Sequence, residues 1–156
     1  MTTEQLQPLH HDHLAALITG DLDRAARLRE RFRAHDHGIA VDLLRAAAAV
    51  CLEHRFGPGA GLGAGPVDHD VLTDFMGEVR AAHRCTEPPP DYLAVEAVIR
   101  SLYGEPHLLE ALDVHPRSQA LYTVLCRQTS RHPWLAANPD RTIARARELA
   151  VVWLLG

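Results

Sequence analysis

Two pairs of residues have the identity and spacing of metal ligands: His10 with His13, and Cys51 with His54. The members of each pair are three residues apart, so in a helix their side chains project to the same side. Four such ligands on facing helices suit tetrahedral Zn²⁺ or another transition metal. The alternative is that the imidazoles are interior groups bonded to backbone or water, with the thiol as a small apolar group. Because this spacing arises easily by chance, we expect no cofactor and keep the metal site as the alternative.

Three of these histidines, His10, His13 and His54, fall on the apolar sides of their predicted helices. We therefore expect their side chains to be buried, and burial lowers the pKa of an imidazole. An unfolded chain would then bind more protons than the folded one, so stability should fall as the pH drops below about 6.5.

Two further clusters, His35-Asp36-His37 and Asp68-His69-Asp70, lie at the boundaries of predicted helices. In a loop their side chains could converge on a cation. The interpretation that we prefer is helix capping, with an aspartate at one helix start and histidines near a helix end.

No catalytic arrangement is recognisable, so the catalytic residues are unknown and enzymatic activity is left open. The two serines, Ser101 and Ser118, both fall within predicted helices and outside a nucleophile-elbow pattern. All 16 basic residues are arginine, which excludes Schiff-base and P-loop lysine chemistry. The segment 59–64 matches a dinucleotide-binding glycine pattern, but a predicted helix precedes it where that pattern needs a strand. We interpret it as a connector.

Charge and cysteine content narrow the function classes further. The net charge is −4 and there are eleven histidines, which argues against a nucleic-acid partner. Three widely spaced cysteines argue against a disulfide framework and for a reducing compartment. The first nine residues lack the features of a signal peptide, and no segment has the ~18 apolar residues of a membrane span. We expect a soluble, cytoplasmic protein without a membrane partner.

Alanine, leucine and arginine dominate the sequence, and no segment alternates long enough to make a strand. The pattern predicts an all-α, single-domain irregular helical bundle of seven or eight helices built from helical hairpins. This domain spans residues 1–156, with flexible loops near 56–66 and 85–90. The predicted helices cover residues 3–18, 21–34, 38–55, 68–84, 92–103, 106–112, 116–130 and 139–155.

The stretch 14–32 resembles one tetratricopeptide-type hairpin, with Gly20 and Asp21 at the turn and Ala25 at the closest approach of the helices. A tetratricopeptide array would repeat about every 34 residues. A shift of that length lands on His54 and Arg55, which do not repeat the turn. The resemblance therefore implies a helical hairpin and no particular family.

The second predicted helix has two different sides. Leu22, Arg29 and Phe32 share one side with two alanines, and a stripe of Arg24, Arg27 and Arg31 forms the other. The stripe could bind phosphate or an acidic partner. Neighbouring carboxylates at ion-pair spacing favour a solvated, paired surface instead.

The last predicted helix ends in turns that are apolar on all sides, including Trp153 and Leu154. We expect these turns to enter the core in part and to contact a second chain in part, as in a homodimer. The leading function is a small soluble binding or adaptor module that engages a protein or small-molecule partner. Its predicted partner-binding residues are Arg24, Arg27, Arg31, Trp153 and Leu154. The alternative is a metal-binding protein or metal-dependent enzyme that uses the inward histidines.

Overall fold

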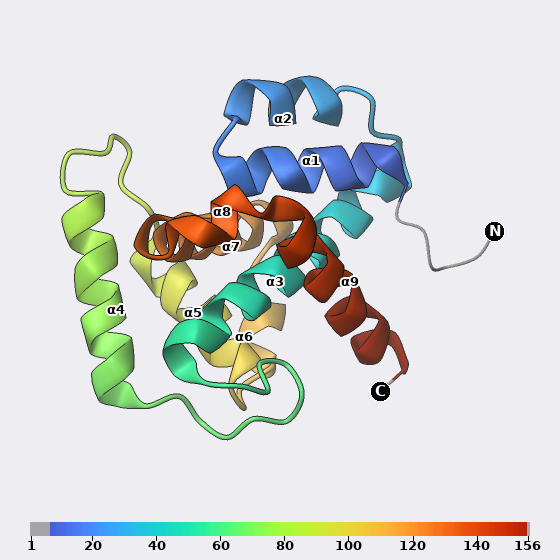
Figure 1. Cartoon of the computed structure of the whole chain (residues 1–156). Coiled ribbons are helices and arrows are strands. Elements are labelled where there is room, and N and C mark those ends of the chain that lie inside the picture. Colours follow the sequence, from blue (N-terminus) through green and yellow to red (C-terminus); the bar gives the residue numbers. More distant parts are fainter. Residues whose placement is uncertain (1–6, 156) are drawn as a thin grey trace.

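The computed structural model describes residues 7–155, and side chains as far as Trp153. Within this part every regular element is an α-helix (Figure 1), which confirms the predicted all-α bundle. Nine helices lie in the described residues, against seven or eight predicted: α1 (Pro8–Thr19), α2 (Leu22–Arg29), α3 (Ala34–Phe56), α4 (His69–Ala82), α5 (Tyr92–Leu102), α6 (His107–Glu110), α7 (Val114–Arg131), α8 (Pro133–Ala137) and α9 (Pro139–Leu155).

Helices α1 and α2 form the predicted hairpin, at one side of the bundle in Figure 1. Gly20 ends α1 with a φ of 79°, a left-handed conformation that glycine adopts without strain. The Asp21 carboxylate then accepts a hydrogen bond from the Arg24 N–H at 3.1 Å and begins α2. The predicted turn is confirmed. Helix α2 ends at Arg29, five residues before its predicted end, and Phe32 follows in the turn.

Helix α3 runs through the middle of the molecule and packs against α1, α7 and α9. The alanines of its segment 46–49 are fully buried, and side chains this small let the neighbouring helices approach closely. The predicted central helix is confirmed. It begins at Ala34 rather than near residue 38. The reason is Asp36, whose Oδ2 accepts a hydrogen bond from the Arg33 N–H at 2.8 Å and so caps an earlier start.

The glycine-rich loop between α3 and α4 is held against the body of the protein. The Gly61 N–H donates to the Leu102 carbonyl at 2.7 Å, and the Tyr103 hydroxyl donates to the Gly57 carbonyl at 2.8 Å. Gly61 has a φ of 75°, which explains why glycine stands there. A helix precedes this loop where a dinucleotide site needs a strand, as the sequence indicated. The loop's flexibility stays a prediction.

The remaining helices start largely where their caps predict. The carboxylates of Asp68 and Asp91 accept backbone hydrogen bonds at the starts of α4 and α5. The additional helix is α8, which begins at Pro133 and has five residues, too few to give a recognisable hydrophobic period.

One cluster of buried apolar side chains includes residues from each of the nine described helices. These helices therefore pack around a common core. Among the described residues, no helix is long and apolar enough to cross a membrane.

Candidate functional site

A cleft of about 510 Å³ opens between the α1–α2 hairpin, the first half of α3 and the start of α7. We call it the hairpin cleft. Its volume lies within the roughly 300–1,000 Å³ that is typical of small-molecule sites. Its apolar lining consists of Leu17, Leu22, Phe32, Ala40, Val41, Leu44 and Val114. Its polar lining consists of His13, Arg29, His37, His115, Ser118, Gln119 and Tyr122.

Phe32 lies among three imidazole rings beside this cleft. Its ring centroid is 4.9 Å from that of His13 and 5.3 Å from those of His10 and His37. His13 and His37 meet the phenyl ring edge to face, at interplanar angles of 66° and 76°. These are favourable aromatic arrangements. Phe32, from the turn after α2, thus fixes the positions of imidazoles from both α1 and α3.

His13 is the most unusual polar group of the cleft. Its side chain is buried, with 5% of the residue exposed, and its Nε2 has no hydrogen-bond partner among the described residues. Burial, and to a smaller extent the nearby Arg29, His10 and His37, together lower the pKa of His13 to about 4. His13 is therefore neutral at neutral pH. A buried nitrogen without a partner costs about 1–3 kcal/mol, which a suitable ligand atom would recover.

Arg29 gives the cleft a fixed positive charge. No carboxylate occurs among the described residues that line the cleft. In the same part of the chain, no carboxylate forms an ion pair with Arg29. The cleft thus combines apolar walls with a guanidinium and several imidazoles, and nothing described within it balances that charge.

Asp36 is a buried carboxylate that does not line the cleft, and both of its oxygens already have hydrogen-bond partners. Its Oδ2 accepts from the Arg33 N–H, and its Oδ1 lies 2.9 Å from Nε2 of His10. The Arg33 N–H, and after it the His10 side chain, lower the pKa of Asp36. This carboxylate joins α1 to the start of α3 and so positions the elements on either side of the cleft.

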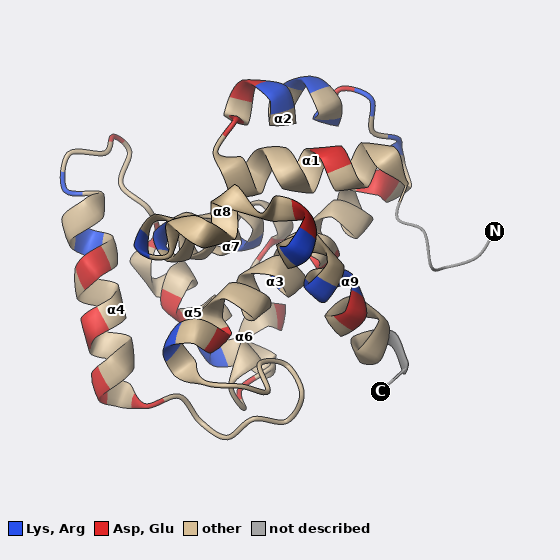
Figure 2. Cartoon of the chain, viewed as in Figure 1, with Lys and Arg blue, Asp and Glu red and all other residues tan. Residues whose placement is uncertain are grey.

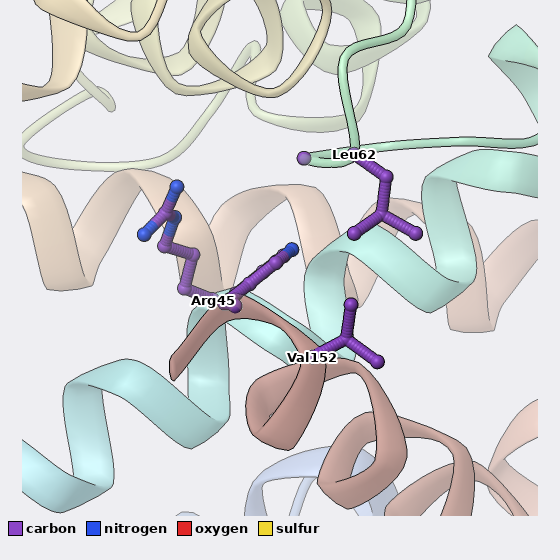
Figure 3. A pocket seen from close by; sticks show the side chains of 5 residues that line it. Arg45, Leu62 and Val152 are labelled. Atoms are coloured by element: carbon purple, nitrogen blue, oxygen red, sulfur yellow. The ribbon is translucent and has the colours of Figure 1, made fainter. Parts of the chain in front are cut away.

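A second hollow, of about 470 Å³, lies between α3, the glycine-rich loop and the end of α9. Figure 3 shows Arg45, Leu62 and Val152 around it. The Arg45 guanidinium carbon lies 4.4 Å from the centroid of the Trp153 ring, a cation–π arrangement. The charged group of this hollow is therefore already engaged within the protein, and we regard the hairpin cleft as the better candidate site.

The structure places the four predicted metal ligands in separate groups. His10 contacts Asp36 at the start of α3, whereas Cys51 lies fifteen residues further along that helix, a distance of roughly 22 Å. Cys51 is fully buried, as the interior alternative expects, and burial raises the pKa of its thiol to about 12. Across the described residues, no group of three or more histidines, cysteines or carboxylates is placed to hold a metal ion.

The predicted burial of His54 is wrong, while that of His10 and His13 is confirmed. His54 lies in the last turn of α3, where its exposed imidazole packs edge to face on Trp134, with 4.9 Å between the two ring centroids. Helix α8, which the sequence pattern did not predict, supplies this surface partner. The apolar side of α3 therefore reaches the protein surface at this turn.

The predicted partner surface is divided between two regions. Arg24, Arg27 and Arg31 are exposed, along α2 and just beyond its end, and Figure 2 shows the basic positions of this hairpin. Trp153 is half-buried against the core, whereas the side chain of Leu154 lies outside the described residues. The last helix therefore enters the core in part. Binding of an acidic partner or a second chain at these residues stays a prediction.

Several residues of the cleft did not appear among the predicted site residues. The signal for Arg29 was its position on the same side of the predicted helix as Leu22 and Phe32, and all three line the cleft. His115 and Tyr122 are seven residues apart and so share one side of α7. Nothing in the sequence indicates that this side of α7 faces the hairpin.

No known protein family, curated protein or solved structure matches this chain. The chemistry of the hairpin cleft is therefore the main indication of function.

Proposed function

We propose that the chain is a small ligand-binding module whose hairpin cleft takes a small organic molecule. The observation that carries this proposal is the buried His13 imidazole, which lines an apolar cleft and whose Nε2 has no partner among the described residues. Apolar walls with a few convergent polar groups and a residue of perturbed pKa are typical of small-molecule sites.

Exposed apolar side chains support the same assignment. Leu22 and Val114 are 52% and 62% exposed, and both line the cleft. A ligand seated there would remove apolar surface from water, at roughly 25 cal/mol per Å². We therefore expect binding to be dominated by apolar contact, with the polar groups selecting the ligand.

The test uses the uncharged fluorescent probe N-phenyl-1-naphthylamine and a variant with a filled cleft. Ala40 lies in the cleft lining, so Ala40→Phe should reduce the space and abolish the rise in probe fluorescence. Ala81→Phe, an equal enlargement at an exposed position of α4, is the matched control. Circular dichroism checks that both variants fold. Equal probe binding by both folded variants, or no binding by the unmodified protein, would refute the proposal.

A further inference from the structure

We infer that the ligand of the hairpin cleft is an amphiphilic carboxylate, an organic monoanion whose charged group pairs with Arg29 and whose apolar body covers the leucine and valine lining. This inference rests on the proposed function and names its ligand class. Three observations carry it: the charge of the cleft, the state of its buried imidazole, and the position of its exposed apolar side chains.

The charge of the cleft selects an anion. Arg29 lines it, the described lining contains no carboxylate, and Arg29 has no ion-pair partner among the described side chains. A guanidinium presents a planar fork of donors that matches a carboxylate. A cationic ligand would find no opposite charge in this lining and would be repelled by Arg29.

The second observation indicates a single negative charge. The buried His13 is neutral at neutral pH, and its Nε2 has no described partner. His37 also lines the cleft and lies near enough to act on His13. One fixed cation with the neutral His13 imidazole beside it suits a monoanion, since a doubly charged group would keep more of its charge uncompensated.

The third observation concerns the body of the ligand. Leu17 and Leu44 form a buried part of the lining, with exposures of 6% and 5%, and Leu22 and Val114 form an exposed part. The apolar lining thus extends from the core to the surface. An inorganic anion would satisfy Arg29 and leave all of this apolar surface uncovered, whereas an amphiphile covers it.

The experiment compares three probes with the same eight-carbon chain: octanoate, octan-1-ol and octylamine. Isothermal titration of the full chain at neutral pH should give a dissociation constant for octanoate about tenfold below that for octan-1-ol, as expected of one charge-assisted hydrogen bond. Octylamine should bind more weakly than either. Chemical-shift changes at Leu17, Val41 and Leu44 should place octanoate in the hairpin cleft.

Two variants on the same helix then identify the charged partner. Arg29→Gln should lose about tenfold in octanoate affinity and keep its octan-1-ol affinity. Arg27→Gln is the matched control, because Arg27 is exposed on α2 and does not line the cleft. It should bind both probes as the unmodified protein does.

Failure of the carboxylate inference can be distinguished from failure of the proposed small-molecule function. Binding of octan-1-ol in the cleft with no gain for octanoate, or an equal loss of octanoate affinity in both arginine variants, would overturn the carboxylate and leave the proposed function standing. If none of the three probes binds and N-phenyl-1-naphthylamine does not bind either, both proposals fail. If the protein self-associates, and Ala40→Phe but not Ala81→Phe abolishes this in sedimentation, a second copy occupies the cleft and the small-molecule assignment is wrong.

Discussion

The buried imidazole of His13 should make the protein lose stability in mild acid, by an amount that can be calculated. Its pKa in the folded protein is about 4, because burial disfavours the charged form, against 6.5 for an unperturbed histidine. Below about pH 6.5 the unfolded chain takes up a proton at His13 that the folded chain does not. The free energy of unfolding therefore falls as the pH drops, until the folded form also becomes protonated near pH 4.

The size of this loss follows from the shift. Each unit of pKa difference corresponds to 1.36 kcal/mol, so the full contribution of His13 is about 3 kcal/mol. Arg29, His10 and His37 act on His13 in the same direction as burial. The hydrogen bonds that lower the pKa of Asp36 stabilise the fold at pH values above the pKa of this carboxyl in the unfolded chain. That stabilisation is lost only below about pH 4. The lowered pKa of Glu105, against 4.5 unperturbed, adds a loss of stability only nearer pH 4, so the interval from about pH 6.5 to about 5 reports chiefly on the imidazoles.

The assay is urea unfolding followed by circular dichroism, at steps from about pH 8 to about pH 4, for the unmodified protein and for His13→Gln. Glutamine does not titrate, so the variant should lose about 3 kcal/mol less over this range. His132, whose pKa burial also lowers, is present in both proteins and cancels in the comparison. His107→Gln, at an exposed position, should follow the unmodified protein. Parallel pH profiles for the unmodified protein and His13→Gln would refute the burial argument.

Three further predictions concern the glycine-rich loop, the centre of the bundle and the metal alternative. Gly61→Ala should destabilise the fold by about 2–4 kcal/mol, because its Cβ would lie 2.6 Å from the Trp153 ring at a φ of 75°. Gly63→Ala is the control, because Gly63 has a φ of 83° and open space around it, and the backbone strain alone should cost only about 1–2 kcal/mol. Equal melting temperatures for the two variants would contradict the predicted clash with Trp153. Gln128→Met removes a buried hydrogen bond of 2.8 Å to the Cys51 carbonyl and should cost about 1 kcal/mol in urea unfolding, so unchanged stability would show that this bond contributes nothing. Because the predicted metal ligands lie in separate groups, chelator treatment of protein purified without a histidine tag should leave the melting temperature unchanged. A lower melting temperature in chelator would support the metal site instead.

Local signals in the sequence were sufficient to predict most helix boundaries. Gly20 and Asp21 define the first turn because a left-handed glycine and a capping carboxylate act within a few residues. The start of α3 was missed by about four residues, since Asp36 lies inside the helix and reaches back to cap it. Helix α8 was missed because five residues are too few to show a hydrophobic periodicity.

The site was less predictable because it depends on which helix sides face each other. The spacing of His10 and His13 correctly predicted two inward imidazoles. At Cys51 and His54 the same spacing predicted two inward side chains, whereas in the structure the thiol is buried and the imidazole is exposed. Periodicity gives the side of a helix on which a residue lies and does not give the helix opposite. His115 could therefore be placed on α7, whereas its meeting with the hairpin required the tertiary fold.

Some of the groups that line the hairpin cleft are unfavourable for the fold itself, and this links stability to binding. His13 is buried with a nitrogen that no described residue satisfies, and Leu22 and Val114 leave apolar surface in water. Arg29 adds a positive charge that lowers the pKa of that same imidazole. A carboxylate with an apolar body would pair with the guanidinium, offer an acceptor beside His13 and cover the apolar side chains. Each of these contacts exists only in the folded chain, so a bound ligand must raise the melting temperature by mass action, and it does so by removing costs that the empty cleft imposes.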